Sequence, residues 1–183
     1  MKQVDLSKFN NSWYRPGGSV KRAIWFFKNI IVLKSSLPWP SFLKVFVLRL
    51  FGAKIGNNVL IKPCVNIKYP WFLEIGDNVW IGEEVWIDNL GKVKIGNNVC
   101  LSQGSLILCG NHDYSKESFD LIVGDITLED GVWVGAKAIV GPGVTMRSHS
   151  VLTAGSVLTK GSEAYGIYSG NPAVWKKQRE INN

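Results

Sequence analysis

From residue 55 onward, the hydrophobic and polar residues of this chain repeat with a period of six. The segments IGNNVL, IGDNVW, IGEEVW and IGNNVC show the pattern, and it returns later as LEDGVW, VGAKAI, VGPGVT and MRSHSV. The first position is a large aliphatic residue, the second is usually Gly or another small residue, and the fifth is usually Val, Ser or Ala. An α-helix needs apolar residues near every 3.6 positions and a half-exposed strand needs strict alternation, so neither explains this period.

A period of six suits a triangular prism in which each face is a short strand and each corner a tight turn. The large aliphatic residue points inward, and a small residue fits where the chain bends. Ile55, Ile75 and Ile95 are each twenty residues apart, so two coils carry a short insertion at a corner. We therefore predict an all-β solenoid, a parallel β-helix of coils that each bury their core against the next.

The repeat fails completely at residues 113–125, DYSKESFDLIVGD, which predicts one long loop projecting from the prism. Loops held on a rigid scaffold commonly carry functional residues. The chain thus divides into an N-terminal segment 1–54, a solenoid 55–163 with its projecting loop, and a C-terminal tail 164–183. We expect the tail to turn at Gly-Asn-Pro and to end in a short basic helix.

Two helices are predicted in the N-terminal segment, over residues 19–34 and 41–51. Ser19 is the expected N-cap of the first, and Gly52 the expected C-terminal stop of the second. Four large apolar residues share one face of the first helix: Val20, Ile24, Phe27 and Ile31. The pair either caps the open end of the first coil or lies on a membrane surface, and the two roles are compatible.

The basic charge of the chain is concentrated in the N-terminal segment. Residues 1–54 hold ten Lys and Arg and one acid, a net +9, whereas residues 55–183 hold eleven and thirteen, a net −2. Such a segment suits anionic lipid or an acidic glycan. We expect no nucleic-acid partner, because no nucleic-acid-binding motif accompanies these charges.

The cysteines and the apolar runs bear on the compartment. Cys64, Cys100 and Cys109 are odd in number and lack CxxC spacing, which argues against a disulfide framework or a zinc knuckle. We expect all three to be buried in strands. With no signal-peptide pattern and no apolar run near the ~20 residues that span a bilayer, we expect a cytoplasmic protein, with membrane association left open.

Several segments together resemble the hexapeptide-repeat O-acetyltransferases over essentially the whole chain. They are the hexads themselves, GNHDYS, VWVGAKAIVGPGVT and AGSVLTKGSEAYGIYSGNPA. The resemblance is greatest to the colanic-acid-biosynthesis type and weaker to galactoside, maltose and xenobiotic acetyltransferases. It implies a left-handed helix, a homotrimer with active sites between subunits, acetyl-CoA as donor and no metal. It also implies a saccharide acceptor, an exopolysaccharide or glycolipid precursor, whose identity and modified hydroxyl the sequence leaves open.

The chain contains only two histidines, His112 and His149. His112 matches the place of the family's catalytic base, at the end of the hexads before the projecting loop. A neutral imidazole can take a proton from an alcohol near neutral pH. The alternative is a histidine that only packs at a coil corner. We expect His149 to be solvent-exposed at a polar corner.

Three more residues are candidates for the acceptor side: Asn89, Asp113 and Tyr114. Related enzymes place a polar side chain about one coil from the base, and Asn89 fits that place. Its alternative role is structural, as a turn residue in the left-handed conformation that Asn tolerates. Asp113 and Tyr114 adjoin the base and have the polar groups to bind acceptor hydroxyls.

The resemblance also indicates where coenzyme A would bind. The expected aromatic neighbour, small corner residues and exit residues are Trp133, Ala136, Ala154, Gly155, Thr159, Lys160, Pro172 and Lys177. Relatives often carry a basic residue directly after the NPA motif, whereas this chain has Val174 and Trp175. Which basic residue holds the 3′-phosphate therefore stays open.

Two other functions are compatible with this scaffold. A γ-class carbonic anhydrase needs three histidine ligands, and the chain has two histidines in all. A non-catalytic β-helix that binds or scaffolds would lack a base at the loop junction and a lysine at the exit from the repeats. We therefore favour the O-acetyltransferase and keep the scaffold as its alternative.

Overall fold

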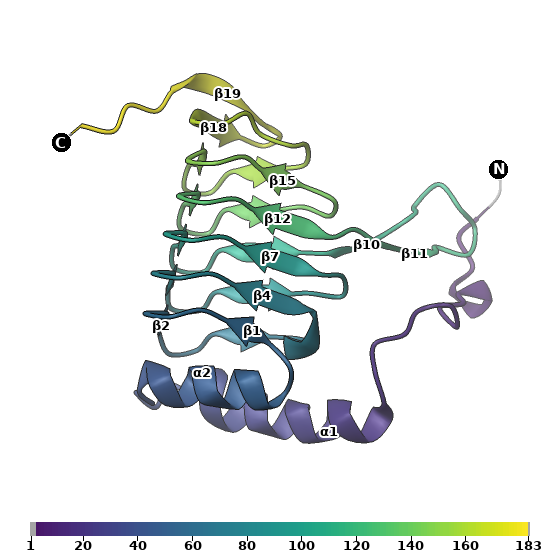
Figure 1. Cartoon of the computed structure of the whole chain (residues 1–183). Helices are drawn as coiled ribbons and strands as arrows, with labels where there is room; N and C mark the ends of the chain where they lie inside the picture. Colours follow the sequence, from purple (N-terminus) through teal and green to yellow (C-terminus); the bar gives the residue numbers. More distant parts are fainter. Residues whose placement is uncertain (1–2, 183) are drawn as a thin grey trace.

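The computed structural model describes residues 3–182 and confirms the parallel β-solenoid. Three parallel sheets of two- or three-residue strands stack into a prism, with two helices beneath the first coil (Figure 1). The first face contains β1 (Lys54–Ile55), β4 (Leu73–Ile75), β7 (Val93–Ile95), β12 (Ile126–Leu128) and β15 (Thr145–Met146). The third face contains β3 (Asn66–Ile67), β6 (Trp86–Asp88), β9 (Leu106–Leu108), β14 (Ile139–Val140) and β17 (Val157–Leu158).

The second face has seven strands, because it continues into the C-terminal end of the chain. Its solenoid strands are β2 (Leu60–Ile61), β5 (Trp80–Ile81), β8 (Cys100–Leu101), β13 (Trp133–Val134) and β16 (Val151–Leu152). The last two are β18 (Gly166–Gly170) and β19 (Ala173–Gln178), which form an antiparallel hairpin on β16. The predicted C-terminal helix is therefore wrong: residues 173–178 are a strand, since β18 offers them a free sheet edge.

The repeat stacks like residues on like. Ile55 lies opposite Ile75, and Ile75 lies opposite Ile95, so the twenty-residue spacing is the length of a coil with its corner insertion. The inward residues at the first and fifth positions fill the prism, and Val65 and Ile67 are fully buried. Each coil therefore takes its apolar neighbours from the coils above and below it, as a solenoid requires.

Close stacking explains the glycine at the second position of the repeat. A Cβ at Gly82 would lie 2.9 Å from the backbone N of Gln103 and 3.0 Å from the carbonyl O of Leu101 on the next coil. The fourth position takes a positive φ at successive corners, as at Asn58 (54°) and Asn98 (56°). Cys64 also lies at such a corner, with φ 60° and partial exposure, so the prediction of a buried strand cysteine is wrong there.

The helices confirm the two predicted ranges and correct their details. α1 (Ser19–Lys28) continues into a π-helix, η2 (Asn29–Leu33), and α2 (Ser41–Leu50) follows. The N-cap of α1 is Gly18, and Ser19 is its first helical residue, with no side-chain cap. The buried side of α1 carries Trp25, whose indole N–H donates to the Ile67 carbonyl at 3.0 Å. The four apolar residues predicted to share one face of this helix are all exposed.

One hairpin leaves the prism at the corner between the third and first faces, which we call the loop corner. It is formed by β10 (Gly110–His112) and β11 (Leu121–Val123), joined by residues 113–120. The N-terminal segment, with the short 3-10 helix η1 (Leu6–Lys8), runs from α1 up to the tip of this hairpin (Figure 1). The backbone N–H of Asp5 donates to the backbone carbonyl of Glu117 at 2.9 Å, so the hairpin and the N-terminal segment together form one projecting arm.

Two corner elements complete the fold. The insertion after β3 forms a 3-10 helix, η3 (Pro70–Phe72), also at the loop corner. Near the top of the prism His149 is only half exposed, because its ring stacks on Tyr165 at 4.8 Å, so the prediction of a solvent-exposed histidine is wrong. Within residues 3–182, no helix has both the length and the apolar character needed to cross a bilayer.

Candidate active site

His112 lies where the chain leaves the solenoid, as the last residue of β10. It pairs with Leu121 of β11 and is half-buried. Gly110 begins the same strand, and a Cβ there would come within 2.4 Å of the Leu90 side chain one coil below. The absence of a side chain at residue 110 thus lets the hairpin leave the prism close against Leu90, which fixes where His112 emerges.

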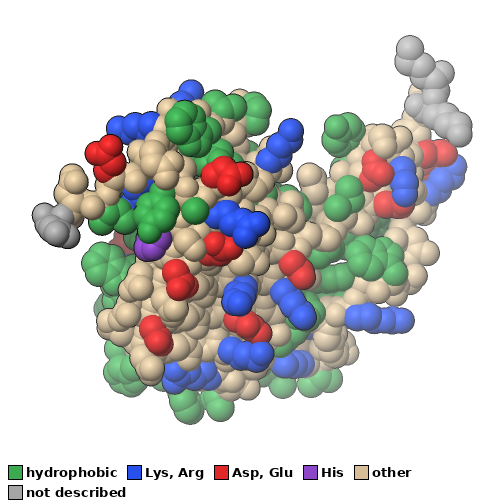
Figure 2. All heavy atoms as spheres, turned by 45° about the horizontal axis from the view of Figure 1, so that its top comes forward, with side chains coloured by type: hydrophobic (Ala, Val, Ile, Leu, Met, Phe, Trp, Pro, Cys, Tyr) green, Lys and Arg blue, Asp and Glu red, His purple; other side chains and the backbone are tan. Residues whose placement is uncertain are grey.

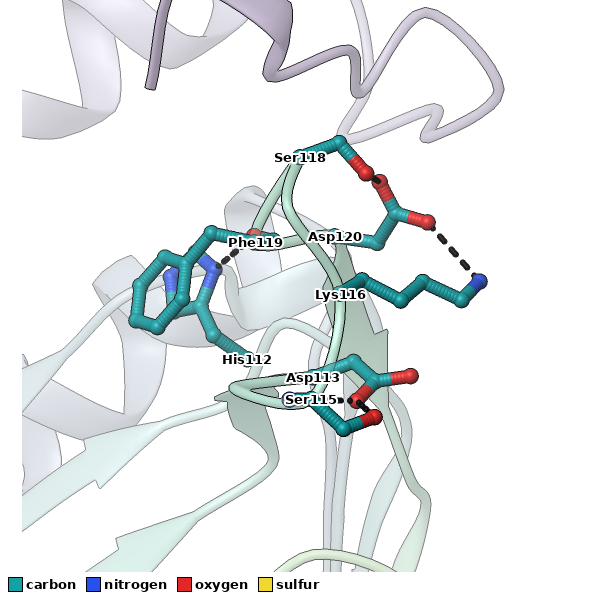
Figure 3. A network of polar contacts seen from close by, with 7 residues as sticks. All are labelled: His112, Asp113, Ser115, Lys116, Ser118, Phe119 and Asp120. Carbon is teal, nitrogen blue, oxygen red and sulfur yellow. Dashed lines mark hydrogen bonds and ion pairs between the residues drawn. The ribbon is translucent and has the colours of Figure 1, made fainter. Parts of the chain in front are cut away.

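Contacts on its ring hold the imidazole of His112 in place (Figure 3). Its Nδ1 lies 2.9 Å from the carbonyl oxygen of Phe119, and the Phe119 ring stacks on it at 4.4 Å with a 7° interplanar angle. Phe9 of the N-terminal segment packs near the imidazole, at 5.7 Å between ring centroids. Because a carbonyl oxygen only accepts, Nδ1 carries the hydrogen of the neutral ring and the lone pair lies on Nε2.

Polar contacts stiffen the loop that supplies Phe119. Lys116 Nζ lies 2.9 Å from Asp120, and Ser118 donates to the same carboxylate at 2.7 Å (Figure 3). These partners lower the pKa of Asp120, since each favours its charged form. The carbonyl that orients His112 therefore belongs to a short loop closed on itself.

The two residues after His112 are arranged differently from each other. Asp113 accepts from the backbone N–H and hydroxyl of Ser115, and these hydrogen bonds lower the pKa of Asp113. Its carboxylate points away from the imidazole in Figure 3. Tyr114 is 84% exposed at the start of the loop. Asp113 is thus directed away from the His112 ring, and Tyr114 lies at the surface.

Asn89 is fully buried one coil below the hairpin. Its Oδ1 accepts from the backbone N–H of Tyr69 at 2.9 Å, and its Nδ2 donates to the Tyr69 carbonyl at 2.6 Å. The φ angle of Asn89 is not positive, so its backbone is not in the left-handed conformation. The geometry therefore favours a structural role over acceptor binding, through hydrogen bonds between coils rather than through a left-handed turn.

The residues expected to bind coenzyme A fall into three groups. Ala136, Ala154 and Gly155 share the corner between the second and third faces, which we call the far corner. There the Gly155 N–H donates to the Ala136 carbonyl at 2.9 Å. The indole N–H of Trp133 donates to Ser102 at 2.9 Å, which holds its half-exposed ring beside that corner.

Thr159 and Lys160 lie instead at the loop corner, above the hairpin. Thr159 Cα is 3.8 Å from the position of a Cβ on Gly141, and Gly143 backbone lies against Gly124, where the hairpin rejoins the prism. Both Thr159 and Lys160 are exposed. The third face separates them, and His112, from the far-corner group of the same chain.

Pro172 and Lys177 lie on the β18–β19 hairpin and are exposed. Lys177 pairs with Ile167 across the hairpin, so its side chain extends from a strand and not from the expected helix. The structure thus brings Ala136, Ala154 and Gly155 together with Trp133, and keeps them apart from His112 within one chain.

Sequence reasoning missed the aromatic residues that hold the arm. Phe9 and Phe119 flank His112, and the Tyr14 hydroxyl donates to the Leu90 carbonyl at 2.7 Å. Burial raises the pKa of Tyr14 well above its usual range, so Tyr14 stays a neutral donor. These residues lie outside the repeat and belong to no motif, so only their tertiary contacts reveal them.

Two concave surfaces of the single chain lie away from His112. One cavity of about 290 Å³ on the first face is lined by residues including Trp71, Lys92 and Asp125, and another of about 320 Å³ lies between α1 and the third face. His112 lines neither. Figure 2 shows a hollow between the projecting arm and the body of the solenoid, which is open in one chain.

Within residues 3–182, no three His, Cys, Asp or Glu side chains lie close enough together to bind a metal ion. The half-buried imidazole with a free Nε2 therefore stands as the main chemical feature of the loop corner.

Comparison with known proteins identifies relatives along the chain. Residues 125–160 match the family described as "Hexapeptide repeat of succinyl-transferase". The chain is 36% identical to the "Putative colanic acid biosynthesis acetyltransferase WcaF" of Escherichia coli, over 96% of this chain and 97% of that protein. It is 30% identical to the galactoside O-acetyltransferase of Escherichia coli, over 72% and 65% of the two chains.

Solved structures share the fold. The hexapeptide-repeat-containing acetyltransferase VCA0836 from Vibrio cholerae, complexed with acetyl coenzyme A, superposes with a TM-score of 0.78 and 20% identity. The match covers 88% of each chain. At this identity, the likeness extends to the solenoid and carries no residue roles.

Proposed function

The chain belongs to the hexapeptide-repeat acetyltransferases, and from that membership we propose that it transfers the acetyl group of acetyl-CoA to a saccharide hydroxyl with His112 as general base. The observation that carries the assignment of the base is the contact between His112 Nδ1 and the Phe119 carbonyl. It leaves Nε2 as the basic nitrogen of a ring that contacts two aromatic side chains, Phe9 and Phe119.

The proposed reaction starts with a hydroxyl placed within hydrogen-bond reach of His112 Nε2. The imidazole takes the hydroxyl proton as the oxygen attacks the thioester carbonyl carbon, and a tetrahedral intermediate forms. The carbon–sulfur bond then breaks, and the imidazolium returns its proton to the departing coenzyme A thiolate. The Phe119 carbonyl accepts from Nδ1–H throughout, which stabilises the positive charge while the ring holds both protons.

Acetyl-CoA as donor is supported by family membership and by the acetyl coenzyme A bound to a protein of the same fold. At the far corner, Ala136, Ala154 and Gly155 leave the backbone open to the amides of the pantetheine arm, since none carries a side chain larger than methyl. In this arrangement Trp133 packs beside the pantetheine. Lys160 and Lys177 are the exposed cations available to the phosphates, with Thr159 and Pro172 beside the adenine.

The separation of these residues from His112 supports a homotrimer. One chain presents the base at its loop corner and the small residues at its far corner, with the third face between them. If the loop corner of one subunit lies against the far corner of the next, each of three equivalent interfaces holds one complete site. The arm then reaches over the neighbouring subunit and closes the hollow seen in Figure 2.

A saccharide acceptor is supported by what the relatives are named for, colanic acid biosynthesis and galactoside acetylation. Asp113 and Tyr114 adjoin the base on the arm, where a free carboxylate oxygen and a phenol can bind sugar hydroxyls. Asn89 is assigned to the fold, because both of its polar atoms bond Tyr69. The alternative of a non-catalytic scaffold gives no reason for an oriented imidazole at the loop junction.

The test measures thiol release from acetyl-CoA with a panel of sugars and nucleotide sugars, with the acetylated product identified by mass. Acceptor-dependent release is expected, and His112→Ala lowers it by at least ~100-fold, because the general base is lost. His149→Asn is the matched control: it removes the other histidine at a φ of 60°, which Asn tolerates. Its rate should stay near that of the unsubstituted protein.

Two results contradict the proposal. Near-normal turnover by His112→Ala would show that His112 is not the general base. Absence of acceptor-dependent release across the whole panel, with acetyl-CoA shown to bind, would favour a binding or scaffolding role.

A further inference from the structure

The base of the molecule exposes two apolar stripes that face away from the solenoid. On α1 and η2 the stripe contains Val20, Ile24, Phe27 and Ile31, on the opposite side of the helix from buried Trp25. On α2 it contains Phe42, Phe46 and Leu50, opposite buried Leu48. Phe27 is 62% exposed and Phe42 76%, so neither stripe is covered by this chain.

The helices lie flat across the base, roughly at right angles to the direction in which the coils stack (Figure 1). Trp25 of α1 contacts Phe51, at the end of α2, at 5.1 Å between ring centroids, which joins the two helices. Capping of the first coil uses only their inner sides, through residues such as Leu33 and Leu48. The seven outer apolar residues are not needed for capping and require another partner.

The charges around the stripes have one sign. Lys28 and Lys34 are exposed beside the α1 stripe, and residues 6–54 contain no Asp or Glu. A cavity of about 320 Å³ at the edge of α1 is lined by Arg22, Lys34 and Lys68. Lys68 pairs with Asp88 at 2.9 Å, so Arg22 and Lys34 supply the positive charge of this cavity. This edge therefore offers anionic groups a cationic recess beside an apolar surface.

We propose that the outer surface of the two helices, at the bottom of the solenoid, is a membrane-docking surface. In this arrangement α1, η2 and α2 lie in the interface of an anionic lipid bilayer. Interfacial helices combine an apolar side that enters the acyl boundary with flanking cations that meet the headgroups. Lys44 and Arg49 do not contribute, because Lys44 Nζ donates to the Lys62 carbonyl at 2.8 Å and Arg49 donates to the Ile55 carbonyl at 2.7 Å.

A second copy of the chain fits this surface less well. A two-fold contact through the base would place the same cations against each other, with no acidic residue in the helices to pair with them. Nucleic acid would match the charges but leave the phenylalanines in water. An anionic bilayer satisfies both the stripes and the cations at once.

The experiment is flotation of the full chain with vesicles of phosphatidylcholine alone or with phosphatidylglycerol. We expect binding that is stronger with phosphatidylglycerol and weaker at high salt. Phe27→Glu combined with Phe46→Glu should weaken it by at least about tenfold, because the apolar stripes can no longer enter the bilayer. Lys28→Gln and Lys34→Gln should each weaken binding to the anionic vesicles by roughly fivefold.

Leu6→Glu is the matched control, since Leu6 is 65% exposed but lies on the arm and not on the base. It should float like the unsubstituted protein. The Phe27→Glu, Phe46→Glu variant and the two lysine variants should keep thiol release with a soluble acceptor, so failure of docking is distinguishable from failure of acetyl transfer. Two results would overturn the proposal. The first is flotation of the Phe27→Glu, Phe46→Glu variant equal to that of the unsubstituted protein. The second is no flotation of the unsubstituted protein together with a sedimenting mass that falls in this variant, which would assign the helical surface to contact with a second copy of the chain.

Discussion

At the scale of single residues, local contacts distinguish His112, the proposed base, from His149, whose ring has a structural role. One nitrogen of His112 is hydrogen-bonded to a backbone carbonyl, and its ring stacks on Phe119 and lies near Phe9. His149 sits at a turn and stacks on Tyr165. Fixing the tautomer matters because a base must present its lone pair, and not its hydrogen, to the acceptor hydroxyl.

Asn89 supplies a prediction at this scale. Asn89→Ala leaves the part-buried N–H and carbonyl of Tyr69 without partners, so the free energy of unfolding should fall by about 1–3 kcal/mol. Chemical denaturation measures the change, with Gln103→Ala at an exposed corner as the control, expected within about 0.5 kcal/mol. Thiol release well below the unfolding transition should fall far less than in His112→Ala. A loss of turnover equal to that of His112→Ala, without loss of stability, would instead place Asn89 at the acceptor.

At the scale of elements, the distance between coils sets which residues the corners accept. The second position of the repeat faces the backbone of the next coil, as the 2.9 Å approach to Gln103 N at Gly82 shows. The fourth position needs a positive φ, which Asn and Gly adopt most readily. Both constraints recur in every coil, which is why the period of six is visible in the sequence.

Gly82→Ala tests this constraint. The added methyl group meets three backbone atoms of the next coil, which cannot rotate away, so we expect a loss of about 1–3 kcal/mol in the free energy of unfolding. Gly18→Ala is the control, because a Cβ there has nothing within 4 Å and φ is −62°. Equal unfolding midpoints for the two variants would show that the coils can separate at little cost.

The elements that the sequence predicted poorly are those whose form depends on distant neighbours. Helical periodicity placed Val20, Ile24, Phe27 and Ile31 on one face, yet Trp25 is what contacts the solenoid. The pattern identifies an apolar face but not what covers it. Similarly, residues 173–178 were expected to be helical, but the free edge of β18 pairs them as a strand.

The candidate site also contains residues that the sequence predicted and residues that it did not. His112 and the projecting loop were predictable, because both lie where a strict repeat stops. The aromatic partners Phe9 and Phe119 were not, since one lies in the N-terminal segment and the other within the loop. Their contact with the imidazole arises only when the arm assembles from the two segments.

At the scale of the whole molecule, the account depends on two corners of different chains meeting. The loop corner holds His112, Thr159 and Lys160, whereas the far corner holds Ala136, Ala154 and Gly155. The proposed trimer, arranged loop corner to far corner, completes three identical sites. With the coil axes parallel to the three-fold axis, it also turns all three helical bases to the same side, so docking on a bilayer gains from three simultaneous contacts.

The most direct measurement of this central claim is thiol release by trimers that mix two inactive variants. His112→Ala removes the base, and Ala154→Trp fills the exposed far corner, so each variant alone should be inactive. The two chains are co-expressed with different tags and purified through both. In every mixed trimer one site of the three joins an intact loop corner to an intact far corner, so we expect about a third of the activity of the unsubstituted trimer. Mixed trimers as inactive as the single variants would mean that each site lies within one chain, which contradicts the shared active site.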